Sequence, residues 1–238
     1  MGKRKIGVIG AMENEVRILR RNMNITFEET VAGMTFSEGT MGNTPLVLVQ
    51  SGIGKVNAGI CACLLIDHFG CDAIINSGIA GSLNNDLEIE DIVVSVDALQ
   101  HDMDVTGLGY EKGTVPGVSV RAFPADEELR RDVVEAVRVV APEVNVVEGR
   151  VVSGDLFVCN KEDKHRIARE TGGLCAEMEG AAAAQAAYLF HVPFVIVRAI
   201  SDKADEIAQK TFAEIEEEAS LRSSAIMAAV LERLGENG

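Results

Sequence analysis

Short apolar runs and amphipathic segments alternate along most of this chain. Runs rich in β-branched residues predict strands, and apolar residues three or four positions apart predict helices. The runs predict strands at residues 5–9, 73–76, 92–96, 144–152 and 192–200, and a hairpin from 34–38 and 45–49. The amphipathic segments predict helices at 13–20, 55–68, 126–140, 161–171, 180–190 and 211–234. This order predicts a three-layer α/β sandwich, a central mixed β-sheet flanked by helices, in one domain spanning residues 1–238.

The segment 173–202 concentrates polar residues that are candidates for chemistry. Glu177 and Glu179 precede an alanine-rich helix, and Asp202 follows a buried strand that contains Arg198. Ligands of open α/β sheets bind beyond the carboxyl ends of the strands, so Asp202 lies where a catalytic acid meets a substrate. Side chains two positions apart share a side in a strand but not in a helix, so a structural role for Glu177 stays open.

Two stretches of small residues are expected to form loops beside a ligand. Residues 51–55 read Ser-Gly-Ile-Gly-Lys, but Val56 follows the lysine, so they do not form the phosphate-binding loop of nucleoside triphosphatases. Residues 77–82 are expected to form a second loop after a short strand, where glycine lets the backbone approach a ligand closely. Residues 106–119 are glycine-rich without a period and predict a surface loop.

Composition limits the classes of partner. The net charge of −15 disfavours nucleic acid, which is bound by clustered lysine and arginine. No apolar run approaches the roughly 20 residues of a membrane helix, so a soluble protein is expected. The five cysteines are odd in number and form no C-x-x-C pair, which favours a reduced, cytoplasmic setting and disfavours zinc. Hydrogen-bonded structural roles are preferred to metal binding for His101, Asp102 and Asp104. We expect a small-molecule ligand and no cofactor or metal.

Several motifs together resemble the nucleoside phosphorylase/hydrolase family. They are Ile-Gly-Ala-Met-Glu-Asn-Glu at 9–15, Ser-Gly-Ile-Gly-Lys-Val at 51–56, His-Asp-Met-Asp-Val-Thr at 101–106, Val-Ser-Gly-Asp at 152–155, Ala-Glu-Met-Glu at 176–179 and Arg-Ala-Ile-Ser-Asp at 198–202. They span nearly the whole chain in the family's order. Within the family, the resemblance is strongest to hydrolases that release adenine from 5′-methylthioadenosine and S-adenosylhomocysteine.

The resemblance implies roles for five residues. Asp202 is the general acid that protonates adenine N7, with Ser201 as its hydrogen-bond partner. An aspartate with an ordinary pKa of about 3.9 is ionised at neutral pH, so the site must raise that pKa or substrate binding must supply the proton. Glu15 activates the water as general base, helped by Arg198. Glu179 accepts the ribose hydroxyls and favours the developing positive charge.

The resemblance also implies a substrate-binding set. Met12 and Met178 lie against the ribose and the 5′-thio group, Phe157 stacks on adenine, and the backbone of Val158 reads its edge. The set is completed by Ile53, Ile79, Ala80, Gly81, Glu177 and Phe212. A homodimer is implied, with loop 106–119 as the expected contact. Two positions depart from the family, since Ile79 replaces a serine of some relatives and Leu108 an aromatic residue donated across the dimer.

Three alternative functions remain open from the sequence. A 6-amino-6-deoxyfutalosine hydrolase would use the same residues on a larger 5′ group. A phosphate-dependent nucleoside phosphorylase is disfavoured, because no arginine cluster for phosphate is evident near Gly78. A nucleoside-binding module without catalytic activity is the alternative from a different class.

Overall fold

The computed structural model describes residues 4–204 and 208–235, and it leaves the side chains of 208–216 undescribed. The strands are β1 (Ile6–Gly10), β2 (Asn24–Val31), β3 (Met34–Met41), β4 (Thr44–Gln50), β5 (Ala73–Ser82), β6 (Ile92–Gln100), β7 (Phe123–Pro124), β8 (Val146–Ser153), β9 (Cys175–Glu177) and β10 (Phe194–Asp202). The helices are α1 (Glu13–Asn22), α2 (Lys55–Cys63), α3 (Glu127–Val140), α4 (Lys161–Thr171), α5 (Gly180–Phe190) and α6 (Ala208–Leu234), with a π-helical turn at Leu64–His68 and a 3₁₀ turn at Thr106–Leu108.

The strands form one mixed sheet, which confirms the predicted fold class. Its order is β10-β6-β8-β9-β5-β1-β4-β3-β2, and β7 pairs with β6. β10 also pairs with β5, in parallel, so the strands β5, β10, β6, β8 and β9 close into a ring. Parallel pairing of β1 with both β4 and β5 brings the carboxyl ends of β1, β5 and β10 to the same edge.

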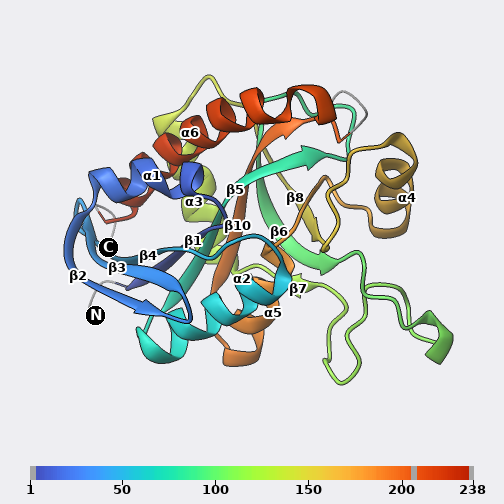
Figure 1. Ribbon diagram of the computed structural model, residues 1–238, viewed down its shortest axis with the longest axis horizontal. Coiled ribbons are helices and arrows are strands. Elements are labelled where there is room, and N and C mark those ends of the chain that lie inside the picture. Colours follow the sequence, from blue (N-terminus) through green and yellow to red (C-terminus); the bar gives the residue numbers. More distant parts are fainter. Residues whose placement is uncertain (1–3, 205–207, 236–238) are drawn as a thin grey trace.

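Helices cover both faces of the sheet (Figure 1). Helices α1, α3 and α6 lie on one face, whereas α2 and α5 lie on the other, and α4 stands beside β8. Each helical layer packs on the sheet through its own apolar cluster. Polar contacts join helices to strands as well, such as Gln100 of β6 with Gln185 of α5 (2.5 Å), and the polar groups of the site come from strand ends and from the first residues of helices.

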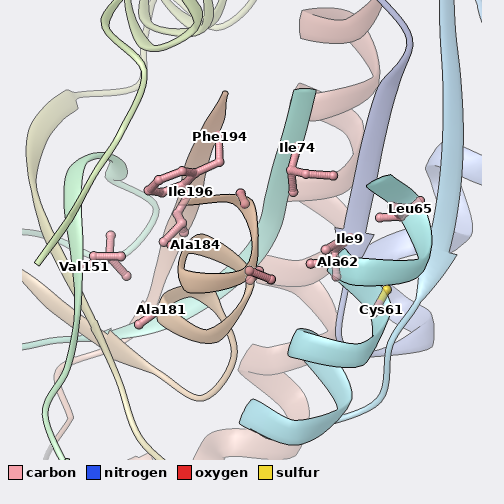
Figure 2. Packing of buried hydrophobic residues seen from close by; sticks show 14 of the residues in the cluster. Ile9, Cys61, Ala62, Leu65, Ile74, Val151, Ala181, Ala184, Phe194 and Ile196 are labelled. Atoms are coloured by element: carbon pink, nitrogen blue, oxygen red, sulfur yellow. The ribbon is translucent and has the colours of Figure 1, made fainter. Parts of the chain in front are cut away.

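The cluster under α2 and α5 is built from small residues on the helices and larger ones on the strands. Figure 2 shows Ala181 and Ala184 of α5 on the side of Phe194 and Ile196 of β10, with Ala62 of α2 close to β1. The alanines carry little side-chain volume and are almost fully buried, so the helix backbone approaches the sheet closely. Close packing of this kind fixes the start of α5, and with it the position of Glu179.

Three predictions about secondary structure need correction. Residues 77–82 are not a loop but the second half of β5, because β10 pairs with them up to Gly81. The strand β2 was missed, since it is an edge strand whose side chains are mostly exposed and show no apolar alternation. The last turn of the predicted helix 55–68 is π-helical. The described chain contains no helix long and apolar enough to cross a membrane.

Candidate active site

One cavity of about 400 Å³ opens at the shared carboxyl edge of β1, β5 and β10. It brings together twelve of the predicted site residues from six separate segments of the chain: Met12, Glu15, Ile53, Ile79, Ala80, Gly81, Phe157, Glu177, Met178, Glu179, Ser201 and Asp202. Ala11 and Ala176 complete its lining. The cavity therefore holds four carboxyl groups within an otherwise mostly apolar wall.

Glu15 reaches the cavity because β1 ends at Gly10 and leaves the neighbouring edge of β5 unpaired. Its carboxylate accepts hydrogen bonds from Ala11 N (2.7 Å), Met12 N (3.0 Å) and Ile79 N (3.1 Å). A Cβ atom at Gly78 would lie 2.3 Å from Glu15 Oε1, so only glycine lets the carboxylate approach this strand. Burial raises the pKa of Glu15, while the charge of Arg198 and the three backbone donors oppose that rise.

Glu179 lies on the opposite wall, directly before α5. Its Oε1 accepts a hydrogen bond from Gly54 N (2.7 Å) at the start of α2. Burial is the main cause that raises the pKa of Glu179 to about 7, and the nearby carboxylate of Glu177 adds to it. The charge of Arg198 opposes this rise, and the hydrogen bond from Gly54 N leaves acceptor capacity on the carboxyl group of Glu179.

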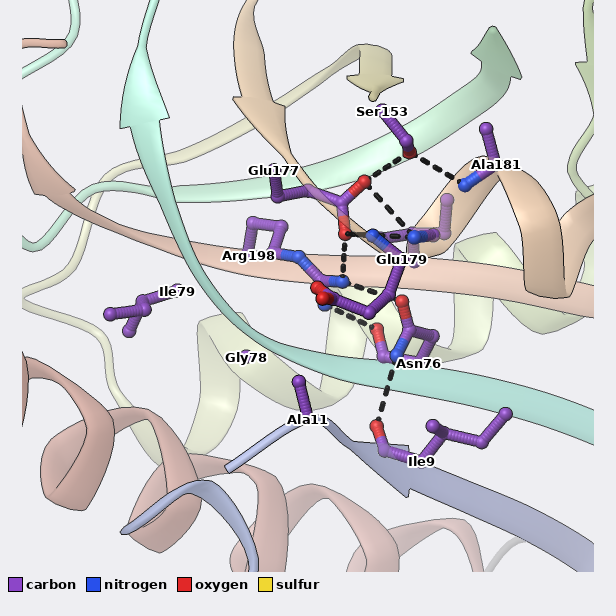
Figure 3. A network of polar contacts seen from close by, with 12 residues as sticks. Ile9, Ala11, Asn76, Gly78, Ile79, Ser153, Glu177, Glu179, Ala181 and Arg198 are labelled. Carbon is purple, nitrogen blue, oxygen red and sulfur yellow. Dashed lines mark hydrogen bonds and ion pairs between the residues drawn. The ribbon is translucent and has the colours of Figure 1, made fainter. Parts of the chain in front are cut away.

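Glu177 has the opposite environment, as Figure 3 shows. Its carboxylate forms a buried ion pair with Arg198 and accepts hydrogen bonds from Ser153 Oγ, Glu179 N (3.1 Å) and Gly180 N (2.8 Å). Acceptance from these two backbone N–H groups satisfies donors at the start of α5. Glu177 thus fixes the helix start that carries Glu179.

Arg198 does not line the cavity but lies behind it, 2% exposed. Its guanidinium donates to Asn76 O (3.0 Å) and Asn76 Oδ1 (2.5 Å) and pairs with Glu177. Burial opposes its charge, but the carboxylates of Glu177, Glu15 and Glu179 together raise the pKa of Arg198. Arg198 therefore remains cationic and acts on Glu15 through its charge, without a hydrogen bond to it among the contacts of the described residues.

Asp202 ends β10 and is held by two donors. Ser201 Oγ donates to Asp202 Oδ2 (2.8 Å), and Ala204 N donates to Asp202 Oδ1 (2.6 Å). Asp202 is 7% exposed, and its Oδ1 lies beside Gly81. Ser201 is thus a hydrogen-bond partner of Asp202, and the Ala204 contact is a further partner that the sequence did not indicate.

The remaining predicted residues have different positions. Phe157 lies at the mouth of the cavity, 41% exposed, whereas Val158 is buried in a small apolar cluster and does not line it. Phe212 falls in the stretch whose side chains the structure does not describe. The roles assigned to all these residues stay predictions.

A polar cluster joins two walls of the cavity. Lys55 Nζ pairs with Asp102 (2.6 Å), and Asp155 Oδ1 accepts from Lys55 N (2.9 Å), while Asp102 Oδ2 accepts from Asp155 N (2.9 Å). The cluster ties the start of α2, which holds Glu179 through Gly54, to the loop that carries Phe157. Asp102 is the residue of the motif at 101–104 that forms this tie, with Lys55 as its ion-pair partner.

Two residues of the site, Asn76 and Ser153, have no role assigned from the sequence, although Ser153 lies in the motif at 152–155. Asn76 joins Arg198 to Ile9 O (3.1 Å), and Ser153 joins Glu177 to Ala181 N (2.7 Å). Both are polar residues in otherwise apolar strands, and this is the signal that could have identified them. Among the described residues, no group of three His, Cys, Asp or Glu side chains is arranged to hold a metal ion.

Comparison with known proteins identifies the family. A sequence model described as the phosphorylase superfamily matches residues 5–233, nearly the whole chain.

The chain belongs to the phosphorylase superfamily.

Among the relatives of this superfamily member is a 5′-methylthioadenosine/S-adenosylhomocysteine nucleosidase of an Exiguobacterium species. It is 45% identical over 237 residues, which cover 97% of this chain and 98% of the relative. A nucleosidase of the same name from Neisseria meningitidis, solved with methylthio-immucillin-A, superposes with a TM-score of 0.91 at 36% identity, covering 96% of this chain and 99% of that one. A futalosine hydrolase of Helicobacter pylori superposes with a TM-score of 0.89 at 32% identity, covering 95% and 97%.

Proposed function

We propose that this superfamily member is a purine nucleosidase that hydrolyses the N-glycosidic bond of 5′-methylthioadenosine and S-adenosylhomocysteine. The products are adenine and the corresponding 5-thio-substituted ribose. The relatives from Exiguobacterium and Neisseria support this activity by name, and the second was solved with a methylthio ligand. The arrangement of carboxyl groups in the cavity supports hydrolysis as the chemistry.

The single observation that carries the choice of hydrolysis over phosphorolysis is the charge of the cavity. Among the described residues that line it, several carry carboxyl groups and none is lysine, arginine or histidine. A phosphate co-substrate is normally bound by such cations, often by arginine in a bidentate contact. A water nucleophile needs only a base, and a developing cation on the ribose is stabilised by carboxylates.

In the proposed mechanism, Asp202 and Glu15 act on opposite sides of the ribose. As the bond between C1′ and N9 breaks, its electrons move to the base and Asp202 gives a proton to adenine N7. Ser201 and the Ala204 N–H fix the Asp202 carboxyl group for this transfer. Glu15 accepts a proton from the water that attacks C1′, and its raised pKa makes it a better proton acceptor.

Glu179 is the proposed ligand of the ribose hydroxyls. Its Oε1 accepts from Gly54 N, so its position is fixed while acceptor capacity remains for hydroxyl groups. The charge of Arg198, held behind the wall by Glu177 and Asn76, favours the ionised forms of Glu15 and Glu179. Met12 and Met178 line the same cavity, where their flexible side chains suit a thioether substituent.

The test is a chromatographic assay of base release in phosphate-free buffer. We expect adenine and free 5-methylthioribose from 5′-methylthioadenosine, with a rate that added phosphate does not raise. A strict requirement for phosphate, with ribose 1-phosphate as the product, would contradict the hydrolase. The same assay with S-adenosylhomocysteine measures how far the 5′ pocket accepts a larger substituent.

A second candidate is the hydrolysis of 6-amino-6-deoxyfutalosine. It is favoured by the similarity to the Helicobacter pylori futalosine hydrolase and by the exposed residues Ile53 and Phe157 at the mouth of the cavity. A larger 5′ group would extend through this mouth. Comparison of kcat/KM for the three nucleosides ranks the candidates, and we expect 5′-methylthioadenosine to be preferred.

The proposal includes a homodimer in the cytoplasm, where adenine release would serve methionine salvage. Exposed apolar residues support the dimer: Ile53 just before α2, Val56 and Ile60 on α2, and Leu108 and Tyr110 on the segment between β6 and β7. This segment extends away from the body of the molecule (Figure 1). Sedimentation of the wild type and of a Val56→Asp variant tests this part, with a dimer expected only for the wild type.

A further inference from the structure

Lys164 is a buried amine that the mechanism above does not use. It lies in α4, 4% exposed, although lysine is seldom buried in proteins. Its Nζ donates a hydrogen bond to the backbone carbonyl of Lys203 (2.7 Å). Lys203 directly follows Asp202, so Lys164 contacts the turn on which the proposed general acid depends.

The turn after Asp202 has an unusual backbone. Ala204 has a φ of +51°, in the left-handed region that non-glycine residues seldom adopt. In this conformation its N–H points at Asp202 and donates to Oδ1 (2.6 Å). Such a backbone persists only where the surrounding contacts hold it.

Three kinds of contact hold the turn: apolar packing of Ala204, the side chain of Lys203 on the Leu87 carbonyl and on Glu88 (3.0 Å), and the amine of Lys164 on the Lys203 carbonyl. The side chain of Ala204 is fully buried in a small apolar cluster with Ile167, which comes from α4. A Cβ atom at Gly81 would lie 3.0 Å from both Ala204 Cβ and Asp202 Oδ1, so the turn packs directly on β5. Apolar packing fixes Ala204, but the carbonyl of Lys203 needs a donor, and Lys164 supplies one.

We propose that Lys164 is a positioning residue for the general acid. By holding the Lys203 carbonyl, it keeps Ala204 in the left-handed conformation and keeps the Ala204 N–H on Asp202. Hydrogen bonds from an ammonium group are stronger than those from neutral donors, which suits a strained turn. This inference rests on the proposed function, because it assigns to Lys164 an effect on the proton transfer by Asp202.

The test separates proton donation from all other steps by a change of leaving group. Lys164→Met keeps the length of the side chain but removes the ammonium group, and Lys161→Met is the matched control at an exposed position of the same helix. Each is assayed with 5′-methylthioadenosine and with the 4-nitrophenyl riboside that carries the same 5-methylthio group. Nitrophenolate leaves without a proton, so its release does not require a positioned acid.

For Lys164→Met we expect kcat for 5′-methylthioadenosine to fall about 10- to 100-fold, as for a misplaced catalytic group, with KM changed less than about twofold. Release of nitrophenolate should stay within about twofold of the wild type, and Lys161→Met should match the wild type on both substrates. Equal losses on the two substrates, or no loss on either, would overturn the inference.

Circular dichroism verifies that each variant is folded. If Lys164→Met does not fold, Lys164→Leu, which also lacks an N–H donor, is compared on the same two substrates with the same criteria. A wild-type chain that releases no adenine would contradict the proposed function, whereas equal losses in a variant of an active wild type would contradict the role of Lys164 alone.

Discussion

Glu177 and Glu179 are two residues apart, yet the structure gives them opposite environments. The carboxylate of Glu177 is paired with Arg198 and accepts hydrogen bonds from Ser153 and two backbone N–H groups. The carboxylate of Glu179 accepts from Gly54 N, and its pKa is raised to about 7. One carboxylate is saturated with donors, and the other keeps free acceptor capacity toward the cavity.

This difference separates a supporting region from a reacting region. The supporting region is the buried network of Asn76, Ser153, Glu177 and Arg198, whose polar groups bond one another except at Arg198 Nε. The reacting region is the cavity wall with Glu15, Glu179 and Asp202. Substitutions in the first region should therefore change mainly stability, and substitutions in the second mainly turnover.

The largest expected effect in the reacting region is that of Asp202→Asn. The amide keeps the size of the side chain but does not supply the proton, so kcat for 5′-methylthioadenosine should fall about 10³- to 10⁴-fold. The melting temperature and the affinity for a non-hydrolysable adenosine analogue should stay close to those of the wild type. If wild type and variant both bind the analogue and neither releases adenine, the protein is a binding module and not an enzyme.

The largest expected effect on stability is that of Glu177→Met. It leaves the guanidinium of Arg198 buried without its counterion, and the free energy of unfolding should fall by about 3–5 kcal/mol, as measured by urea titration. The double variant Glu177→Met/Arg198→Met should recover most of that loss, since no buried charge remains unpaired. A single variant as stable as the wild type would show that the network does not support the fold.

Glu179 should link ligand affinity to pH. With a pKa of about 7, it is mostly protonated at pH 6 and mostly ionised at pH 8. The dissociation constant of a 5′-methylthio nucleoside analogue with a cationic ring nitrogen should thus fall by about 10-fold between these pH values. Isothermal titration calorimetry measures this change, and Glu179→Gln should abolish it.

The carboxyl group of Glu179 should make the folded protein less stable as pH rises, whereas it should make ligand binding tighter. A carboxyl group whose pKa is raised on folding stabilises the fold below its unfolded pKa, near 4.5, and loses that contribution as pH rises through about 7. Urea titrations of Glu179→Gln should therefore show a smaller loss of stability between pH 4.5 and 7 than those of the wild type. An identical pH dependence in both proteins would contradict the raised pKa.

The smallest expected effect is that of Asp155→Ala, between the two regions. It removes the carboxylate that accepts from Lys55 N at the start of α2, and loss of such a cap costs about 1 kcal/mol. KM should rise a few fold, because the walls carrying Gly54 and Phe157 lose one tie, and kcat should change little. Glu162→Ala, at an exposed position, is the control.

Local patterns predicted much of this fold. The start of α5 at Gly180 could be predicted because an alanine-rich run, typical of a helix, follows Glu177 and Glu179. The central strands could be predicted because they are apolar runs. The edge strand β2 has no apolar alternation, and β5 continues through small residues only because β10 pairs with them. Pairing between strands over a hundred residues apart leaves no local pattern in one sequence.

The same limit applies to the site. The carboxylates that line the cavity could be predicted from motifs at strand ends, because that edge of the sheet is where ligands bind. The neutralisation of Glu177 by Arg198 and the contact between Lys164 and Lys203 could not, since each depends on side-chain geometry across the sheet. The residues that line the cavity can therefore be predicted from the sequence more readily than the residues that position them.

The position of β10 between β5 and β6 has a consequence for biosynthesis. A ribosome that has made the first 190 residues has completed nine of the ten strands, but the strand that closes the ring is still missing. Until it emerges, β5 and β6 each present an unpaired edge, which is a known route to aggregation. Nascent chains stalled before β10 has emerged from the ribosome should therefore bind chaperones. Chains that have emerged as far as Asp202, the last residue of β10, should no longer do so.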